Sequence, residues 1–227
     1  MRQRKLRNRI ARRENCENLR IPYEIPSFDL RQIDLSRSYF DFEEIFGNTN
    51  PVYMEIGCGK GQFATEFAKK NPDVNIIGVE CVKDVLIQAC EKTQQQNISN
   101  IRYLEMKAEY LPIFIKEKSV AGIFLNFSTP FPKKSHAKHR LTSPDFLNIY
   151  KKILRDGGVI EQKTDSQILF ESSIENFSQN GFELYNISLD LHNSNFEGNI
   201  VTEYEQRFVE QGLPIYRLEA KLKKQKK

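Results

Sequence analysis

The sequence predicts an α/β fold with a single doubly wound, mostly parallel sheet of seven strands. Two observations lead to this prediction. From residue 52 onward, short apolar and β-branched runs alternate with segments that have helical periodicity, a pattern typical of parallel strands joined by helices. The first run is followed at once by closely spaced glycines, as expected where a buried strand turns into a helix beside a ligand.

The elements follow in order along the chain. A short helix is expected in FDFEEIFG, ended by Gly47. The expected strands are VYMEI, VNIIGVE, IRYLEM, VAGIFLNF, GVIEQKT, FELYNISLD and PIYRLEA, and the expected helices are GQFATEFAKK, 82–96, EYLPIFI, PDFLNIYKKIL, 166–179 and EYEQRFVEQG. In segment 82–96, Val82, Val85, Leu86 and Ala89 share one helical face. We expect one domain over residues 21–220.

Charge is distributed unevenly along the chain. The net charge is +4, but residues 1–13 hold seven Arg or Lys and residues 221–227 hold five Lys, with no acid in either segment. The body between them is therefore acidic. We expect a basic, mobile arm in 1–20 and a Lys-rich tail in 221–227, both suited to a polyanionic partner. The alternative is that both segments are solvated and only aid solubility.

Composition excludes several classes of protein. No apolar run approaches the roughly 18 residues that span a bilayer, and the N-terminal charges precede no apolar stretch of a secretory signal. The cysteines, Cys16, Cys58, Cys81 and Cys90, show no CxxC spacing. We therefore expect reduced thiols, a cytoplasmic location and no membrane partner. His136 and His139 lack a third ligand nearby, so no metal is expected.

The first turn after a strand reads Glu55-Ile-Gly57-Cys-Gly59-Lys-Gly61, and Glu80 ends the next strand. A dinucleotide site would have its third glycine one residue later. An acid that opens the glycine loop and another that closes the second strand resemble class I S-adenosylmethionine-dependent methyltransferases. The resemblance implies S-adenosylmethionine as cofactor. The alternative is a glycine turn and an exposed glutamate of an ordinary doubly wound protein.

A second motif follows the fourth expected strand, in residues 126–141. Two prolines stiffen this loop around Phe131. Basic-type side chains then gather within eight residues: Lys133, Lys134, His136, Lys138, His139 and Arg140. A stiff loop with an aromatic ring and basic side chains favours phosphate contact and base stacking. The alternative is an exposed lysine-rich loop.

Four motifs together, in the same order over roughly residues 50–218, resemble the bacterial tRNA (guanine-N7)-methyltransferase, or TrmB, family. They are the glycine loop, the loop 126–141, Lys163-Thr164-Asp165 and Thr202-Glu203-Tyr204-Glu205. The resemblance implies methylation of N7 of a guanine in the tRNA variable loop, at position 46. The implied partner is tRNA, and DNA is not expected as a substrate.

The resemblance also implies roles for individual residues. Catalysis would rest on Asp165 and Thr129. The cofactor site would comprise Glu55, Gly57, Gly59, Gly61, Glu80, Lys107, Ala108, Asn126 and Thr129. The substrate site would comprise Lys133, His136, Arg140, Asp165, Thr202, Glu203, Tyr204 and Glu205. A purely structural role remains the alternative for two of these groups. Asp165 could serve to stabilise the start of a helix, and Thr202 with Glu205 could serve as a capping box.

The sequence departs from the family pattern in four places. Thr129 and Lys107 stand where the family has Asp, Phe131 where it has Trp, and His139 where it has Arg. Guanine N7 has a free lone pair, so alignment and electrostatics can suffice without a base. Asp165 or Glu205 could stabilise the cationic product. A degenerate relative that binds tRNA without methylating it remains the alternative, whereas the basic tails disfavour a small-molecule or protein methyltransferase.

Overall fold

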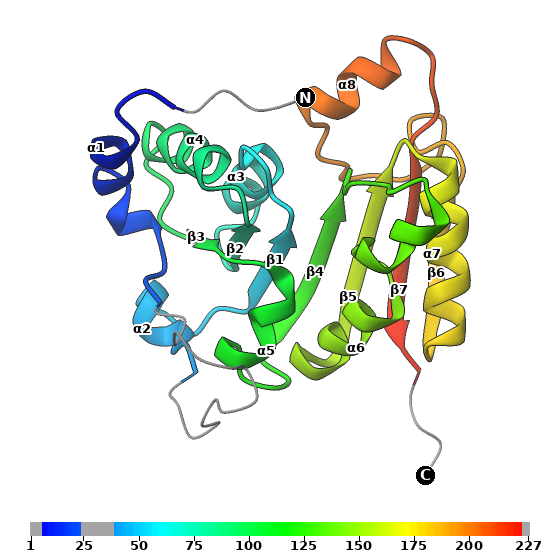
Figure 1. Ribbon diagram of the computed structural model, residues 1–227, viewed down its shortest axis with the longest axis horizontal. Coiled ribbons are helices and arrows are strands. Elements are labelled where there is room, and N and C mark those ends of the chain that lie inside the picture. The colour runs from blue at the N-terminus through cyan, green and yellow to red at the C-terminus, as the bar shows by residue number, and fades with distance from the viewer. Residues whose placement is uncertain (1–5, 24–38, 224–227) are drawn as a thin grey trace.

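The computed structural model describes residues 6–23 and 39–223, and its centre is a seven-stranded sheet in the order β3-β2-β1-β4-β5-β7-β6 (Figure 1). The strands are β1 (Val52–Ile56), β2 (Asn75–Glu80), β3 (Ile101–Glu105), β4 (Val120–Asn126), β5 (Leu154–Thr164), β6 (Phe182–Ser188) and β7 (Tyr216–Leu222). The α-helices are α1 (Arg9–Glu14), α2 (Phe42–Phe46), α3 (Gln62–Lys70), α4 (Lys83–Gln94), α5 (Leu111–Phe114), α6 (Pro144–Ile153), α7 (Gln167–Gln179) and α8 (Glu203–Val209).

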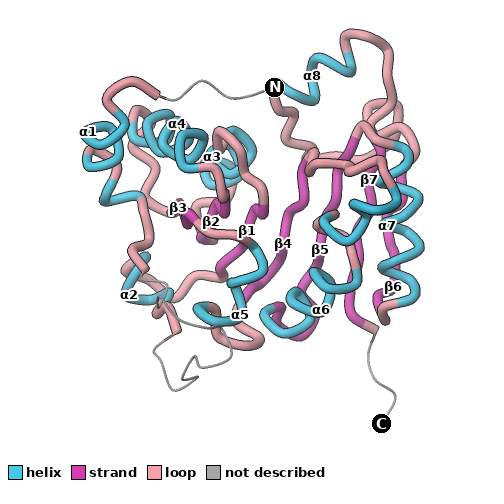
Figure 2. Tube along the Cα trace, in the orientation of Figure 1, coloured by secondary structure: helices cyan, strands magenta, loops and turns pink. Residues whose placement is uncertain are grey.

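Helices cover the sheet on both faces (Figure 2). Along β2, Ile76 belongs to the same buried cluster as Leu86 of α4, whereas its neighbour Ile77 belongs to the cluster that contains Leu147 of α6. Successive side chains of a strand point to opposite faces, so this alternation places α4 and α6 on opposite sides of the sheet. The predicted doubly wound sheet is confirmed. One detail differs, because Val82 precedes α4 and is 42% exposed.

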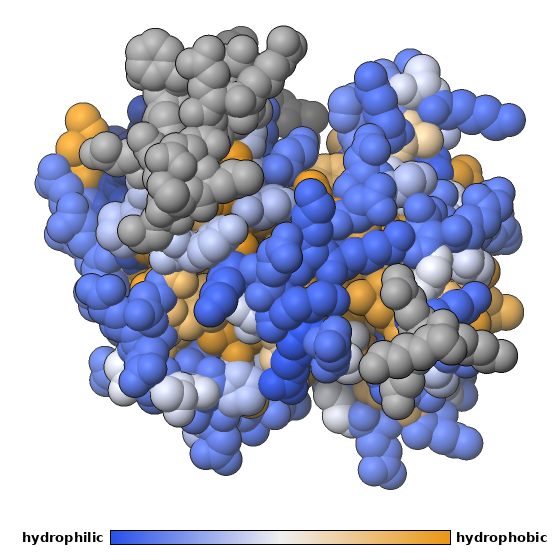
Figure 3. Space-filling model, turned by 90° about the horizontal axis from the view of Figure 1, so that it is seen from below, coloured by the Kyte–Doolittle hydropathy of each residue, from blue (hydrophilic) through white to orange (hydrophobic). Residues whose placement is uncertain are grey.

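Strands β1 to β5 run parallel, and β7 pairs antiparallel with both β5 and β6. The last strand of the chain therefore lies between the two that precede it. As a result, the carboxyl ends of β1, β2, β4 and β5 meet at one edge of the sheet (Figure 1). Figure 3 shows the opposite end of the molecule, where hydrophilic residues dominate and apolar ones appear in separate spots.

The segment 6–23 packs against the domain, and the expected mobility of the arm 1–20 stays a prediction. Cys16 and Leu19 are buried. Arg12 forms an ion pair with Glu91 of α4 at 2.6 Å, and Arg20 forms one with Glu105 of β3 at 3.1 Å. The arginines have acidic partners 79 and 85 residues further along the chain, which a local charge count does not reveal. Residues 1–5 lie outside the described part.

The first residues of the expected tail 221–227 belong to the sheet. Strand β7 continues to Leu222, and Lys221 pairs with Val159 and Glu183 in the sheet. Residues 224–227 lie outside the described part, so the domain bounds of 21–220 stay a prediction. Within residues 6–23 and 39–223, no helix is long and apolar enough to cross a membrane. The same residues contain no group of three or more His, Cys, Asp or Glu placed for a metal ion.

Candidate active site

The glycine loop between β1 and α3 has a conformation that favours glycine. Gly57, Gly59 and Gly61 have φ angles of 79°, 56° and 71°, which side chains with a Cβ rarely adopt. At Gly61 a Cβ would also collide with the Tyr103 hydroxyl and lie 2.8 Å from the Ala89 Cβ. Glycine at all three positions therefore suits the turn, and Gly61 also allows the start of α3 to pack closely against β3 and α4.

Glu55 is the buried acid of the site. Its two carboxylate oxygens accept hydrogen bonds from Ala64 N–H at 3.1 Å and from Asn126 Nδ2 at 3.0 Å. Burial raises the pKa of Glu55 to about 8, although these two donors oppose the shift. The proton on this carboxyl can therefore leave near neutral pH, when a cation arrives beside it.

Glu80 holds the glycine loop from the neighbouring strand. It accepts from Gly59 N–H at 3.2 Å and from Val82 N–H at 2.9 Å. Further along the same edge, Ala108 is buried and Lys107 is exposed at the start of a 3-10 turn, Ala108–Tyr110. The five residues expected to bind the cofactor from β1, β2 and the glycine loop thus lie at the carboxyl edge of the sheet, and their contacts with a cofactor stay a prediction.

Two polar atoms at the end of β4 and in the loop after it are left without partners. Asn126 Oδ1 and Ser128 Oγ are buried and make no hydrogen bond in the part of the chain that the structure describes. Such atoms are costly unless a bound group or water satisfies them. Glu55 can ionise, and Glu80 lies at the end of the second strand, where an acid can hydrogen-bond ribose hydroxyls. With the two unpartnered atoms, these acids fit a ligand that carries a cationic amino group and hydroxyls. This fit supports S-adenosylmethionine as the bound cofactor.

The basic loop after β4 forms a 3-10 turn, Lys134–His139, and it exposes Thr129, Lys133 and His136. The ring of Phe131 lies 5.8 Å from that of His139. The exposure of these side chains agrees with the expectation of an RNA-binding surface. The contacts between this loop and RNA stay a prediction.

Arg140, by contrast, is the buried basic residue of this loop. It is 7% exposed, and its guanidinium donates to the carbonyls of Pro130 and Phe131, both at 3.0 Å. Phe131 has a φ of 41°, an uncommon conformation for a bulky residue. Arg140 therefore holds the strained loop through the carbonyls of Pro130 and Phe131, and its contact with a substrate stays a prediction.

Asp165 follows β5 and is half-buried beside Tyr204 of α8. Burial and the neighbouring Asp165 carboxylate together raise the pKa of Tyr204. The Tyr204 ring lies 5.0 Å from that of Phe127, which follows β4 with a φ of 51°. The structure thus brings the fourth-strand loop, the Thr-Asp end of β5 and α8 together at one place, although they are far apart in the sequence.

Thr202 and Glu205 form only half of a capping box. Thr202 Oγ1 accepts from Glu205 N–H at 3.1 Å, so Thr202 caps α8. The Glu205 side chain does not return to the helix start. It is fully buried, with Oε2 at 2.8 Å from Lys163 Nζ and Oε1 at 2.8 Å from His192 Nε2.

The Glu205 side chain is thus enclosed by groups of the chain itself and has no exposed surface, and the expected contact between Glu205 and the guanine stays a prediction. Lys163 also donates to Asn199 Oδ1 at 3.0 Å and to Ile200 O at 2.9 Å. Burial raises the pKa of Glu205, but Lys163, Asn199 and His192 outweigh it and hold that pKa below its usual value. The lysine, the glutamate, His192 and Asn199 are called the Lys163 network below. It ties α8 to β5.

Sequence reasoning missed most of the Lys163 network, and also Gln62, whose Oε1 accepts from Glu203 N–H at 2.7 Å. Glu203 is itself exposed. The one available signal was a lysine within the apolar run of β5, since a buried lysine requires an acidic partner. Gln62 begins α3 directly after the glycine loop, so its bond connects the cofactor side of the site to α8.

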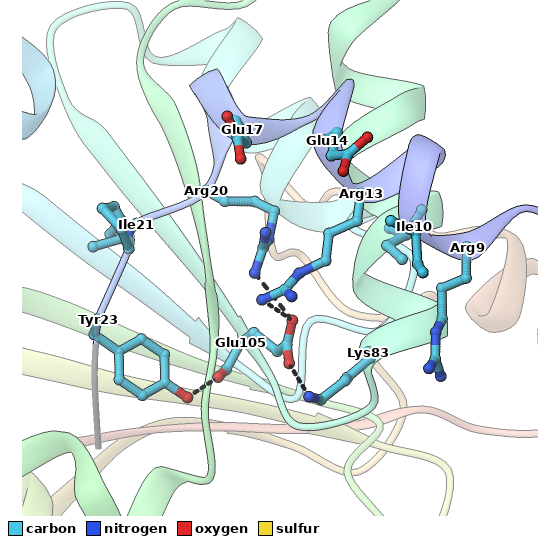
Figure 4. Close-up of a pocket in the computed structure, with 12 residues that line it drawn as sticks. Arg9, Ile10, Arg13, Glu14, Glu17, Arg20, Ile21, Tyr23, Lys83 and Glu105 are labelled. Carbon is cyan, nitrogen blue, oxygen red and sulfur yellow. Dashed lines mark hydrogen bonds and ion pairs between the residues drawn. The ribbon is translucent and has the colours of Figure 1, made fainter. Parts of the chain in front are cut away.

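A separate cavity of about 1110 Å³ lies between segment 6–23 and α4 (Figure 4). Arg13, Arg20 and Lys83 converge on Glu105 at 3.7, 3.1 and 3.2 Å, and Tyr23 bonds the Glu105 carbonyl. Glu14 and Glu17 also line it. Four basic side chains in the lining thus face three acids, and the net charge of only +1 gives the cavity little selectivity for a polyanion.

Comparison with known proteins agrees with this geometry. The family described as "Putative methyltransferase" matches residues 49–218. A tRNA (guanine-N(7)-)-methyltransferase of Listeria monocytogenes serotype 4b is 50% identical over 180 residues, covering 79% of this chain and 84% of that protein. The protein of the same name from Bacillus subtilis strain 168 is 47% identical over 175 residues, covering 77% and 82%.

Among solved structures, the 16S rRNA methyltransferase KamB aligns with a TM-score of 0.60 and 18% identity, covering 83% of this chain and 96% of that one. At this identity the likeness concerns the fold alone. The family match, over residues 49–218, includes all four motifs from the glycine loop to α8. This chain therefore belongs to the tRNA (guanine-N(7)-)-methyltransferase family.

Proposed function

We propose that this protein transfers the methyl group of S-adenosylmethionine to N7 of a guanine in tRNA, in the variable loop. The observation that carries the proposal is the family relationship, at 50% identity over most of both chains. The site adds independent support, since it holds an ionisable buried acid and unpartnered polar atoms at the edge of the sheet. A tRNA substrate also favours a cytoplasmic location.

The cofactor end of the site is built from β1 and β2. When bound, S-adenosylmethionine supplies the methyl group on its sulfonium. Glu55, once ionised, attracts the cationic amino group of the ligand, and the Glu80 carboxylate accepts hydrogen bonds from ribose hydroxyls. The glycine loop allows the backbone to approach the ligand closely.

The substrate end lies between the basic loop, Asp165 and α8. Guanine N7 carries a lone pair at neutral pH, so this chain has no proton to remove before methyl transfer. Asp165 accepts hydrogen bonds from the N1–H and N2–H₂ edge of the base and stabilises the positive charge that develops on the ring. The Lys163 network positions α8 so that Tyr204 stays beside Asp165. Lys133 and His136 contact phosphate or stack on a base from the exposed loop.

The test is incubation of the purified protein with labelled S-adenosylmethionine and unmodified tRNA, followed by nucleoside analysis. We expect label in 7-methylguanosine, with none on duplex DNA. Label found only in protein or in small molecules would refute the proposal, and tRNA binding without turnover would instead support a non-methylating relative.

A pair of variants tests the division of roles. Asp165→Asn removes a charge-assisted contact, and we expect kcat to fall about 30-fold or more, with cofactor affinity unchanged. Thr129→Ala forfeits at most a neutral hydrogen bond of about 1 kcal/mol, so its kcat should fall roughly fivefold or less. Equal losses in the two variants would contradict the assignment of the electrostatic role to Asp165.

A further inference from the structure

A second polar cavity, of about 450 Å³, lies at the end of β6 and the start of β7. It is called the Arg217 pocket, and it is lined by Asn186, Ile187, Ser188, Ser194, Asn195, Phe196, Glu197 and Arg217. In the sheet register Arg217 lies opposite Lys163 of β5, two residues before Asp165. Adjacent strands are about 4.8 Å apart, so Arg217, which forms one wall of the pocket, lies beside the end of β5 that leads to Asp165.

The guanidinium of Arg217 is buried with part of its hydrogen-bonding capacity unused. The residue is 1% exposed, and Phe196 stacks over the guanidinium at 3.6 Å. Its Nη2 contacts the carboxylates of Glu161 and Glu219, the latter at 2.6 Å. Nε and Nη1 are also buried, and neither has a partner within the described residues. Burying unmatched donors is costly, so this pocket calls for an acceptor from outside the chain.

The charges around the pocket decide what kind of acceptor it takes. Glu161 and Glu219 contact the single cation, and Glu197 adds a third acid at the rim. With one arginine against three acids, a phosphate would be repelled. A neutral carbonyl oxygen can accept from either the free Nε–H or the free Nη1–H, and an amino or imino group beside it can donate to Glu197. The edge of a nucleobase carries both kinds of group.

We propose that the Arg217 pocket binds the base of a tRNA nucleotide that flanks the target guanine. This inference rests on the proposed function, because it requires tRNA as the substrate. The pocket lies one strand beyond the substrate site, on the side away from the cofactor. Sequence-selective RNA recognition uses unstacked bases read on their edges. Arg217 and the rim residues would thus determine which sequence contexts the enzyme accepts.

The experiment uses tRNA transcripts that differ only in the nucleotides on either side of the target guanine. Equilibrium affinity and kcat/KM are both measured, so binding tests the pocket even without turnover. For the wild-type protein we expect about a tenfold preference between the best and worst flanking base, consistent with one base-edge contact. A wild-type protein that methylates or binds all transcripts equally would overturn the inference while leaving the proposed function intact.

Variants connect that preference to the pocket. Arg217→Met removes the unpartnered donors, and we expect the flanking-base preference to fall below about twofold while S-adenosylmethionine affinity is unchanged. Because Arg217 is buried, Asn195→Ala at the exposed rim gives a second variant that leaves the core intact, and it should reduce the preference by about half or more. The matched control is Asn148→Ala on the exposed surface of α6, which should keep the full preference.

Two results would count against the pocket as the reader of the flanking base. One is that Asn195→Ala keeps the full flanking-base preference, and that Arg217→Met, if it folds, keeps it too. The other is an equal change in the Asn148→Ala control. Absence of methyl transfer to any transcript, with the base preference still present in binding, would instead refute the proposed function and support the pocket.

Discussion

Replacing Lys163 by Met tests how much the Lys163 network contributes to stability. Lys163 and Glu205 are fully buried with 2.8 Å between Nζ and Oε2, and removal of one partner from a buried pair costs about 3–5 kcal/mol. His192 and Asn199 still bond the remaining carboxylate. We therefore expect a loss of ~3 kcal/mol in the free energy of unfolding, or a Tm lower by roughly 6–12 °C for a domain of this size.

Urea denaturation of four proteins measures this prediction as a double-mutant cycle. Glu205→Gln alone should cost ~2 kcal/mol because Lys163 keeps its bonds to Asn199 and Ile200, and the double variant should cost less than the sum of the single ones. The control is Lys69→Met, whose ion pair with Glu66 has a similar distance of 2.7 Å but is exposed. It should cost under ~0.5 kcal/mol.

Acid stability gives a second readout of the same pair. Because the folded-state pKa of Glu205 is lowered, its contribution is complete above the ordinary value of 4.5 and is lost as pH falls through the folded pKa. Glu205→Gln should therefore flatten the stability profile below pH 4.5. Strictly additive single losses, or equal losses for Lys163→Met and Lys69→Met, would refute the reasoning that burial gives this pair its strength.

Two further predictions concern the cofactor side. At pH 7, binding of S-adenosylmethionine should release about 0.9 proton, since Glu55 with a pKa of about 8 is protonated before the cation arrives. Calorimetry in two buffers of different ionisation enthalpy measures the number of protons released. An equal proton release by the Glu55→Gln variant would contradict this prediction. Gly61 and Gly212 both have a φ near 70°, so replacing either by Ala should lower the free energy of unfolding by about 1 kcal/mol. Gly61→Ala should lose a further 1–3 kcal/mol through contact with Tyr103 and Ala89, so equal urea midpoints would disprove the steric part.

The elements of the fold could be predicted from the sequence because their signals are local. Alternating apolar residues and punctuating glycines determine where a strand or helix starts and ends, and Gly47 indeed ends α2 with a φ of 70°. The position of β7 between β5 and β6 has no such local signal. It depends on which strand edges remain free once the parallel part has formed.

The site was predicted less completely, for a related reason. Residue type indicated correctly that Glu55 and Glu80 lie at the carboxyl edge. It could not indicate what a charged side chain contacts within the chain, as the partners of Arg140 and Glu205 show. A basic or acidic residue in a motif is compatible with either role until the distant groups around it are known.

Segment 6–23 has one more consequence, which concerns the outer edge of the sheet. Strand β3 is an end strand, and Arg20 forms a bridge with Tyr103 there, where Ile21 N–H donates to the Tyr103 carbonyl at 2.9 Å. The opposite end strand, β6, has a bulge between Tyr185 and Ser188. Exposed strand edges are templates for intermolecular pairing. During synthesis, the residues that shield β3 leave the ribosome some 80 residues before β3 itself. The shielding segment is therefore already available when this aggregation-prone edge forms.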